Sequence, residues 1–229
     1  MDYFVEHFRL NFIEGDRWRY LTDGLFVTLE LTFFAALLGV FLGFLVAIIR
    51  ATHDKPGKLK VLDFICRVYI KIIRGTPTVV QLLIIYFVLF GSVNISKVVV
   101  AIIAFGINSG AYVTEIVRSG IMSIDNGQFE AGRSLGFNYV QTMRYIVMPQ
   151  AFKNVLPALG NEFIVLLKET SVSGYIALQD LTKGGDIIRS RTYDAFFPLI
   201  AIALIYLVLV LIFTQLVNML ERRLRNSEH

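Results

Sequence analysis

The sequence has 229 residues, of which 55% are hydrophobic and only 17% are charged, and its mean hydropathy is +0.63. This composition excludes an ordinary soluble domain, in which about 25% of residues are charged. The formal net charge of +4 is spread among apolar segments without a concentrated basic patch, so nucleic-acid binding is not expected. The one cysteine, Cys66, leaves no intrachain disulfide to place.

Long apolar stretches predict an all-α, polytopic membrane protein with five transmembrane helices. Each stretch is near or above the roughly 20 residues that a helix needs to cross hydrocarbon. They cover 25–49, 72–90, 98–117, 155–178 and 195–220. Small residues four apart, Gly39 with Gly43 and Gly106 with Gly110, predict close packing of the first and third spans.

The rest of the chain divides around these spans. Residues 1–20 mix charges with aromatic side chains and lack the basic start of a signal peptide, so we expect a retained, extracytoplasmic interfacial segment. Residues 21–220 form the transmembrane part, with a loop at 118–153, and 221–229 form a tail. Lys and Arg are about twice as frequent on the side of the loop and tail, which predicts a cytoplasmic C-terminus and an outer N-terminus.

A basic, amphipathic stretch precedes the second span. Arg67, Lys71 and Arg74 recur at helical spacing, which predicts a helix at the inner interface before Gly75 and Pro77 redirect the chain. The alternative is that these side chains only snorkel at a helix end.

The 118–153 loop is far longer than the 2 to 8 residues usual between packed helices. Asp125 with Gln128 predicts the start of a short helix, and Gly136 its left-handed end. Asn138 with Gln141 predicts the start of a second helix. The short helix carries Phe129, Ala131 and Leu135, and it is expected to dock onto a partner or, alternatively, to fold back on the chain's own inner surface.

Catalytic and metal-binding patterns are not found. The sequence has no phosphate-binding Gly-x-x-x-x-Gly-Lys-Ser/Thr loop, no Gly-x-Ser-x-Gly elbow and no His-Glu-x-x-His helix. Its three histidines lie far apart, without cysteines at ligand spacing. We therefore expect neither an enzyme nor a metal site.

The loop carries a family resemblance. Glu130-Ala131-Gly132, then Gly136, then Ile146-x-Met148-Pro149 resembles the Glu-Ala-Ala loop of permease subunits of bacterial ABC importers. Gly132 replaces the second alanine of that pattern, which makes the helix slightly less stable, and Met148 replaces a leucine. Three other segments resemble the polar amino-acid branch of the family: 74–77 with Gln81, 108–112 with Glu115 and Arg118, and 161–171.

The resemblance implies a type I importer permease that imports a polar amino acid. It implies a second permease copy, either identical or a paralogue, two cytoplasmic ATPase subunits and an extracytoplasmic amino-acid-binding protein. ATP and Mg would be bound by the ATPase subunits, so this chain needs no cofactor of its own. The residues that the resemblance implies for coupling to the ATPase are Glu130, Ala131, Gly132, Gly136 and Pro149.

Polar side chains within the expected spans should face protein, water or substrate, because charge in hydrocarbon is costly. On the fourth span, Asn161 and Lys168 share one stripe, and Glu162 and Glu169 the next. The predicted substrate-binding residues are Glu162, Asn161, Asn108, Tyr112, Thr76 and Gln81. Because Glu162 has no basic residue at i±3 or i±4, it is expected to meet the side chain of a cationic amino acid.

Alternatives remain for these residues. Glu115 and Arg118 can form a local salt bridge, and Lys168 or Glu162 can pair with a charge on another helix. For the whole chain, an ion-gradient-driven secondary transporter is the first alternative, although such transporters often show internal repeats, and none is visible here. A membrane-embedded enzyme is the second.

Overall fold

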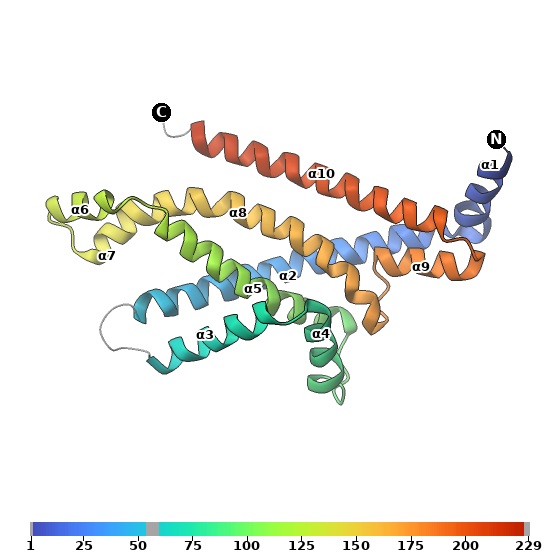
Figure 1. The fold of residues 1–229 in the computed structure, drawn as a ribbon, viewed down its shortest axis with the longest axis horizontal. Coiled ribbons are helices and arrows are strands. Elements are labelled where there is room, and N and C mark those ends of the chain that lie inside the picture. Colours follow the sequence, from blue (N-terminus) through green and yellow to red (C-terminus); the bar gives the residue numbers. More distant parts are fainter. Residues whose placement is uncertain (1, 54–59, 227–229) are drawn as a thin grey trace.

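The structure, a computed structural model, describes residues 2–53 and 60–226, and these are helical without any strand. Figure 1 shows the long helices running along one direction, as the apolar stretches predicted. The N-terminal part comprises α1 (Asp2–Phe8), η1 (Arg9–Ile13), η2 (Glu14–Asp16), α2 (Trp18–His53), α3 (Lys60–Gly75), α4 (Thr78–Leu83) and η3 (Ile84–Leu89). The rest comprises α5 (Lys97–Met122), α6 (Asn126–Ser134), α7 (Tyr139–Thr142), η4 (Met143–Val147), α8 (Met148–Glu169), η5 (Thr170–Ile176), α9 (Leu181–Thr192) and α10 (Phe196–Asn226).

The centre of the bundle is the contact between α2 and α5. A Cβ built at Gly39 would lie 2.8 Å from the Cβ of Ser109, and one at Gly106 would lie 2.6 Å from Leu38. Only glycine therefore permits this approach of the two helices, which confirms the packing role predicted for these residues. Leu31 and Phe105 are fully buried in the core beside this contact.

Within the described residues, three helices are long and apolar enough to cross a membrane: Trp18–Arg50, Lys97–Met122 and Phe196–Leu224. A fourth candidate is a bent pair, Lys60–Gly75 with Thr78–Leu89, whose two parts meet at 113°. The apolar stretch predicted at 72–90 therefore contains the bend and is not one continuous helix. The redirection predicted at Gly75 and Pro77 is confirmed, because α3 ends at Gly75 and Pro77 is extended, with φ −65° and ψ 136°.

The predicted fourth apolar helix, 155–178, also differs in the structure. The helix α8 starts earlier, at Met148, with Pro149 in its first turn, where a missing N–H costs no hydrogen bond. It ends at Glu169, and the following residues form the 3-10 helix η5. Because of its polar flank, α8 is not among the helices apolar enough to span by composition alone.

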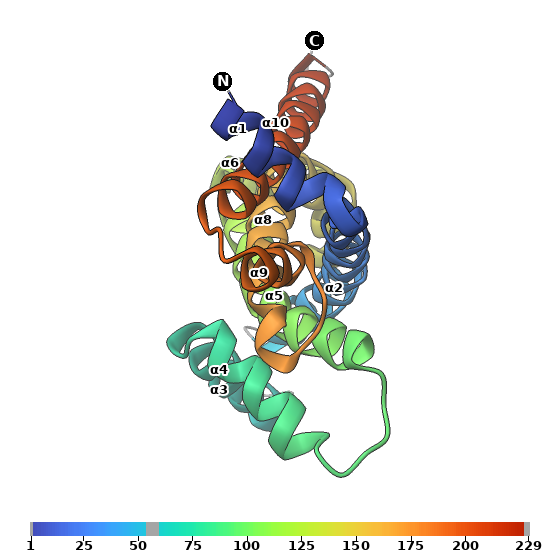
Figure 2. The same cartoon turned by 90° about the vertical axis from the view of Figure 1, so that its right-hand side faces the viewer.

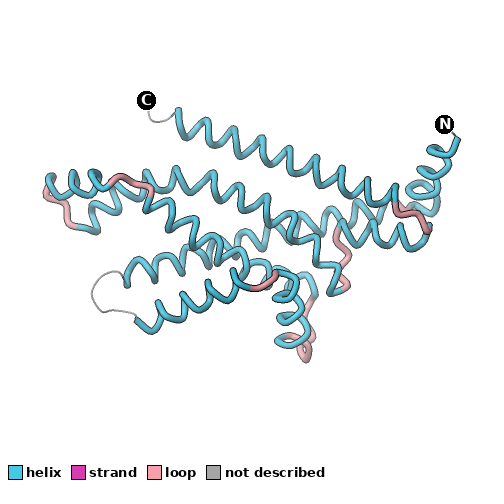
Figure 3. The backbone as a smooth tube through the Cα atoms, viewed as in Figure 1, coloured by secondary structure: helices cyan, strands magenta, loops and turns pink. Residues whose placement is uncertain are grey.

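The N-terminal segment is tied to the turn between α9 and α10. His7 Nδ1 lies 2.8 Å from Asp194 Oδ2, Asn11 Nδ2 donates to the same oxygen at 2.8 Å, and Thr192 donates to Asn11 Oδ1. Figure 2, the end view, shows α1 lying across this end of the bundle. The opposite end carries the end of α2, the start of α3, α6 and α7, and α10 runs toward it (Figure 3).

Candidate functional site

A polar groove runs along α5 and α8, facing the end of α3. Its volume is about 620 Å³. Its walls are formed by Arg74, Tyr112, Glu115, Ile116, Ser119, Gly120, Ser123, Asn154, Ala158 and Glu162. The structure thus brings together two of the predicted substrate residues, Glu162 and Tyr112, from different helices.

Glu162 is half-buried in this groove and accepts a hydrogen bond from Ser109 Oγ at 2.8 Å. No ion pair of Glu162 or Lys168 within 4.0 Å appears among the side chains that the structure describes. The interhelical pair considered for Glu162 is therefore not formed within the described chain. Its carboxylate keeps its second oxygen for another donor.

A second charged group in the groove is Arg74. Its guanidinium lies over the Tyr112 ring, 5.6 Å from the ring centroid, and 3.7 Å from Glu115. Glu115 also pairs with Arg118 and with Arg50, each at 3.2 Å. The predicted Glu115–Arg118 pair is confirmed, but Glu115 joins three arginines rather than one.

Gln81 and Asn108 form a buried network at the bend after α3. Pro77 has no N–H, so the carbonyl of Ile73 loses its helical partner, and the Gln81 amide donates to this oxygen at 2.7 Å. The same amide donates to Thr76 Oγ1 at 2.8 Å, and Asn108 Nδ2 donates to Gln81 Oε1 at 2.8 Å. Thr76, Gln81 and Asn108 are thus brought together, and their hydrogen bonds stabilise the bend between α3 and α4.

Asn161 lies apart from the other predicted substrate residues. It lines a neighbouring groove with Lys153, Asn154, Pro157, Ala158, Glu221 and Leu224, of which Asn154 and Ala158 line both grooves. Consecutive residues of a helix point about 100° apart, so Asn161 and Glu162 face different neighbours. Asn161 faces the C-terminal end of α10. The structure does not place Asn161 in the groove of Glu162.

The caps predicted in the loop after α5 are present. Asp125 is the N-cap of α6 and accepts from Gly127 N at 2.7 Å, whereas Gln128 bonds Gln150 instead of closing a capping box. Gly136 has φ +78°, the left-handed conformation that glycine adopts without steric cost. Asn138 and Gln141 form the predicted reciprocal capping box at α7.

The two faces of α6 differ. Phe129 packs against Ile124, Val147 and Ala151, and a Cβ at Gly132 would lie 2.6 Å from Thr142. This contact explains why glycine stands where the family pattern has alanine. Three of the predicted loop residues, Glu130, Ala131 and Leu135, are exposed. One face therefore folds back on the chain, and the other is free for a partner.

Sequence reasoning did not assign Arg74, in the wall of the groove, or Ser109, which bonds Glu162, to the substrate site. Ser109 follows Asn108 directly in the sequence. Gly39 lies opposite it, and this glycine indicated close packing of two helices but gave no sign of a ligand contact. The sequence placed Arg74 in an interfacial helix and at the start of the family-like segment 74–77, but not among the substrate-binding residues. Across the described residues, no cluster of His, Cys, Asp and Glu suits a metal ion.

Comparison with known proteins decides the family. The family described as the inner membrane component of binding-protein-dependent transport systems matches residues 39–226. The chain belongs to this family. Its resemblance to permease subunits of bacterial ABC importers is thereby confirmed.

Relatives of this permease match along nearly their whole length. An arginine transport system permease protein of Bacillus subtilis (strain 168) is 38% identical over 211 residues, covering 91% of this chain and 94% of the relative. A putative glutamine transport system permease protein of Rickettsia typhi is 37% identical over 207 residues, covering 90% and 93%.

Solved structures agree with the fold of the permease. The crystal structure of an amino acid ABC transporter with histidines is 46% identical, covers 90% of this chain and 94% of its own, and has a TM-score of 0.83. A methionine ABC transporter in an inward-facing conformation is 20% identical, with a TM-score of 0.77, and supports the fold alone.

Proposed function

We propose that this chain is the transmembrane subunit of an ATP-driven importer that moves a polar, cationic amino acid across the cytoplasmic membrane by alternating access. The observation that carries the proposal is the groove with Glu162, an acidic group between helices of a binding-protein-dependent permease. The names of the arginine and glutamine permeases among the relatives support an amino-acid cargo.

The groove offers complementary charges for such a cargo. Glu162, with Ser109 as its only side-chain donor within the described residues, would receive the cationic side chain. Arg74 at the other wall would receive the α-carboxylate, since a guanidinium binds carboxylates through two parallel hydrogen bonds. Tyr112 would contact the cargo between them. Thr76, Gln81 and Asn108 hold the bend after α3 and Asn161 lines the neighbouring groove, so this proposal assigns none of them a cargo contact.

The partners follow from the groove and the loop. Because the groove is open on one side and has Arg74, Glu115 and Glu162 in its walls, a second permease copy would close it away from lipid. The exposed face of α6, with Glu130, Ala131 and Leu135, would dock on one of two ATPase subunits, which bind ATP and Mg. Gly132, Gly136 and Pro149 would shape this coupling segment. An extracytoplasmic binding protein would deliver the amino acid.

In this proposal the chain crosses the membrane five times, through α2, the bent α3–η3 pair, α5, α8 and α10. The N-terminus lies outside and the C-terminus in the cytoplasm. The positions of α1 and α6 at opposite ends of the bundle support this orientation. Of the tail predicted at 221–229, residues 221–226 continue α10, and 227–229 lie outside the described residues.

Cysteine labelling tests the orientation. In a Cys66→Ser background, Tyr193→Cys should react with an impermeant thiol reagent added outside intact cells, because Tyr193 is 96% exposed at the α9–α10 turn. Ser134→Cys, on the exposed face of α6, should react only after permeabilisation. The reverse pattern would invert the topology and remove α6 from the cytoplasm.

Co-purification tests the assignment as a permease subunit. Affinity-tagged protein, solubilised in mild detergent, should bring down an ATPase subunit in equal amounts. Leu135→Glu should weaken this association, because it replaces the exposed apolar side chain at the C-terminal end of α6 with a charge. Arg144→Glu, an exposed change off α6, is the matched control. A secondary transporter would purify without any ATPase.

A further inference from the structure

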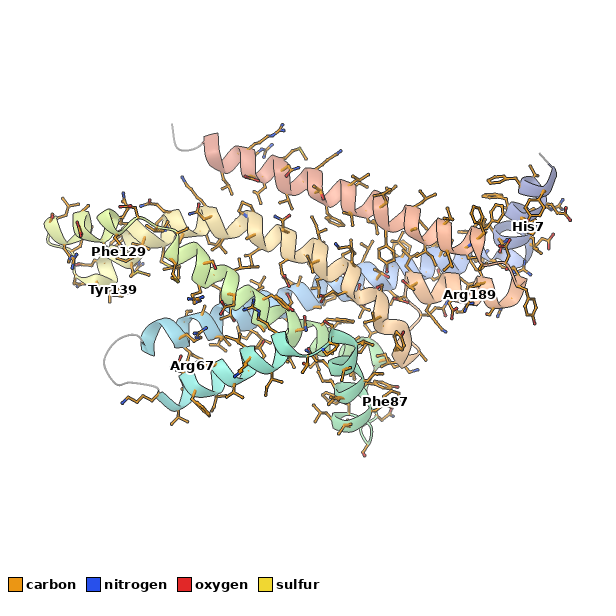
Figure 4. All side chains as sticks on the ribbon, viewed as in Figure 1. His7, Arg67, Phe87, Phe129, Tyr139 and Arg189 are labelled. Carbon is orange, nitrogen blue, oxygen red and sulfur yellow. The ribbon has the colours of Figure 1, made fainter. Side chains whose placement is uncertain are left out.

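A second cavity, separate from the groove of Glu162, lies where α2, α3 and α5 meet α7. Its volume is about 360 Å³, and it shares no lining residue with that groove. It is lined by Ala47, Arg50, Asp63, Arg67, Thr114, Arg118, Ile121, Met122, Tyr139 and Met143. Figure 4 labels two of these residues, Arg67 on α3 and Tyr139 on α7.

The cavity gathers arginines from three helices: Arg50 from α2, Arg67 from α3 and Arg118 from α5. Asp63 is 3% exposed and is the acidic residue of the lining; Arg67 Nε donates to it at 2.6 Å and Arg50 Nε lies 3.7 Å from it. Glu115 does not line this cavity, but it pairs with two of its arginines, Arg50 and Arg118, and also with Arg74.

Among the described residues, this cluster holds more guanidinium groups than carboxylates. Four guanidinium groups meet two carboxylates within the described part of the chain. Arg50 Nε is buried and makes no hydrogen bond. The side chains of Arg67 and Arg118 are about half exposed, so their outer N–H donors face solvent and are accessible to a ligand. A ligand with two or more acidic oxygens would supply the missing charge and acceptors.

The position of the cavity is at the edge of the hydrocarbon region. Arg50 is the last residue of one candidate span, and Met122 is the last of another. Next to the cavity, a shallow groove on α3 combines Lys60, Arg67 and Lys71 with Phe64 and Val68, and Arg67 lines both. Basic side chains with apolar neighbours at this depth suit the phosphate of a lipid headgroup.

We propose that the cavity between α2, α3, α5 and α7 binds a phosphate group, carried by an anionic phospholipid or by a small phosphate ester. Arginines recognise phosphate through paired N–H donors, and three helices supply them here from different directions. A bound phosphate would connect α7, at the base of the coupling segment, to α2 and α3. The binding site does not depend on which cargo the permease carries.

The test uses the permease purified with its ATPase subunits and stripped of lipid. Phosphatidylglycerol, phosphatidylcholine and soluble glycerol 1-phosphate are titrated separately, and the thermal midpoint and retained lipid in native mass spectrometry are measured. Met122 is 68% exposed at the edge of the cavity, so replacing it should not disturb folding. Met122→Glu adds a charge that repels phosphate, and Met122→Gln is its neutral match.

The expected result is binding of phosphatidylglycerol but not of phosphatidylcholine, weakened at least about tenfold by Met122→Glu and preserved in Met122→Gln. Binding of glycerol 1-phosphate with the same response to the two variants would support the site and assign it to a soluble phosphate ester. The proposal is overturned if neither phosphate compound binds, or if Met122→Glu binds like wild type. Uptake assays do not enter this test, so its failure leaves the proposed function untouched.

Discussion

Uptake of labelled arginine should fall at least about tenfold when Glu162 is replaced by glutamine, with the complex still assembled. The substitution preserves shape and removes the charge that would face the cationic side chain. A hydrogen bond to a charged group contributes about 1.5–3 kcal/mol, which corresponds to a tenfold or larger change. Arginine and glutamine uptake should be compared in the wild type and the Glu162→Gln variant.

Ser109→Ala is the matched control for this prediction. It removes the hydroxyl that donates to Glu162 Oε1 but leaves the carboxylate charge, so uptake should fall only a few-fold. If Glu162→Gln lowers arginine and glutamine uptake equally, the cationic preference is wrong. If the variant instead fails to accumulate while Ser109→Ala accumulates normally, Glu162 belongs to a structural ion pair across the assembled complex.

Gly136→Val should weaken the coupling between the ATPase subunits and the transmembrane helices. Gly136 has φ +78° and nothing within 4 Å of a built Cβ, so the penalty is purely conformational. The left-handed conformation costs an ordinary residue about 1–2 kcal/mol, and a β-branched residue more. The α6–α7 turn should therefore reorganise, and both uptake and substrate-stimulated ATPase activity should drop several-fold.

Gly136→Asn provides the comparison, because asparagine tolerates positive φ far better than valine does. It should retain most of the coupling, while binding of the amino acid to the external binding protein should be unchanged in both variants. Normal stimulation and normal uptake in Gly136→Val would show that this turn has no part in the mechanism.

Local features were predictable because they depend on neighbouring residues. The caps at Asp125 and Asn138, the left-handed Gly136 and the break at Pro77 follow from the chemistry of a few adjacent positions. The Glu115–Arg118 pair is predictable for the same reason, since helical spacing brings i and i+3 together.

Features that depend on how helices meet were not predictable in the same way. The 113° bend follows from a break whose angle is set by packing and by the Gln81 contacts, not by Pro77 alone. Helical periodicity placed Asn161 beside Glu162, but only the packed positions of α5 and α10 separate the two grooves they line. Likewise, no sequence spacing indicates that Arg50 and Arg74 converge on Glu115.

The central claim is that this chain forms the pathway of an ATP-driven amino-acid importer. The most direct measurement is uptake of labelled arginine into proteoliposomes that contain the permease and its ATPase subunits, with ATP and Mg enclosed and the binding protein added outside. Uptake should require both ATP and the binding protein, and should persist after ionophores abolish every ion gradient. Uptake that proceeds without ATP and stops when the ion gradients are abolished would contradict the account.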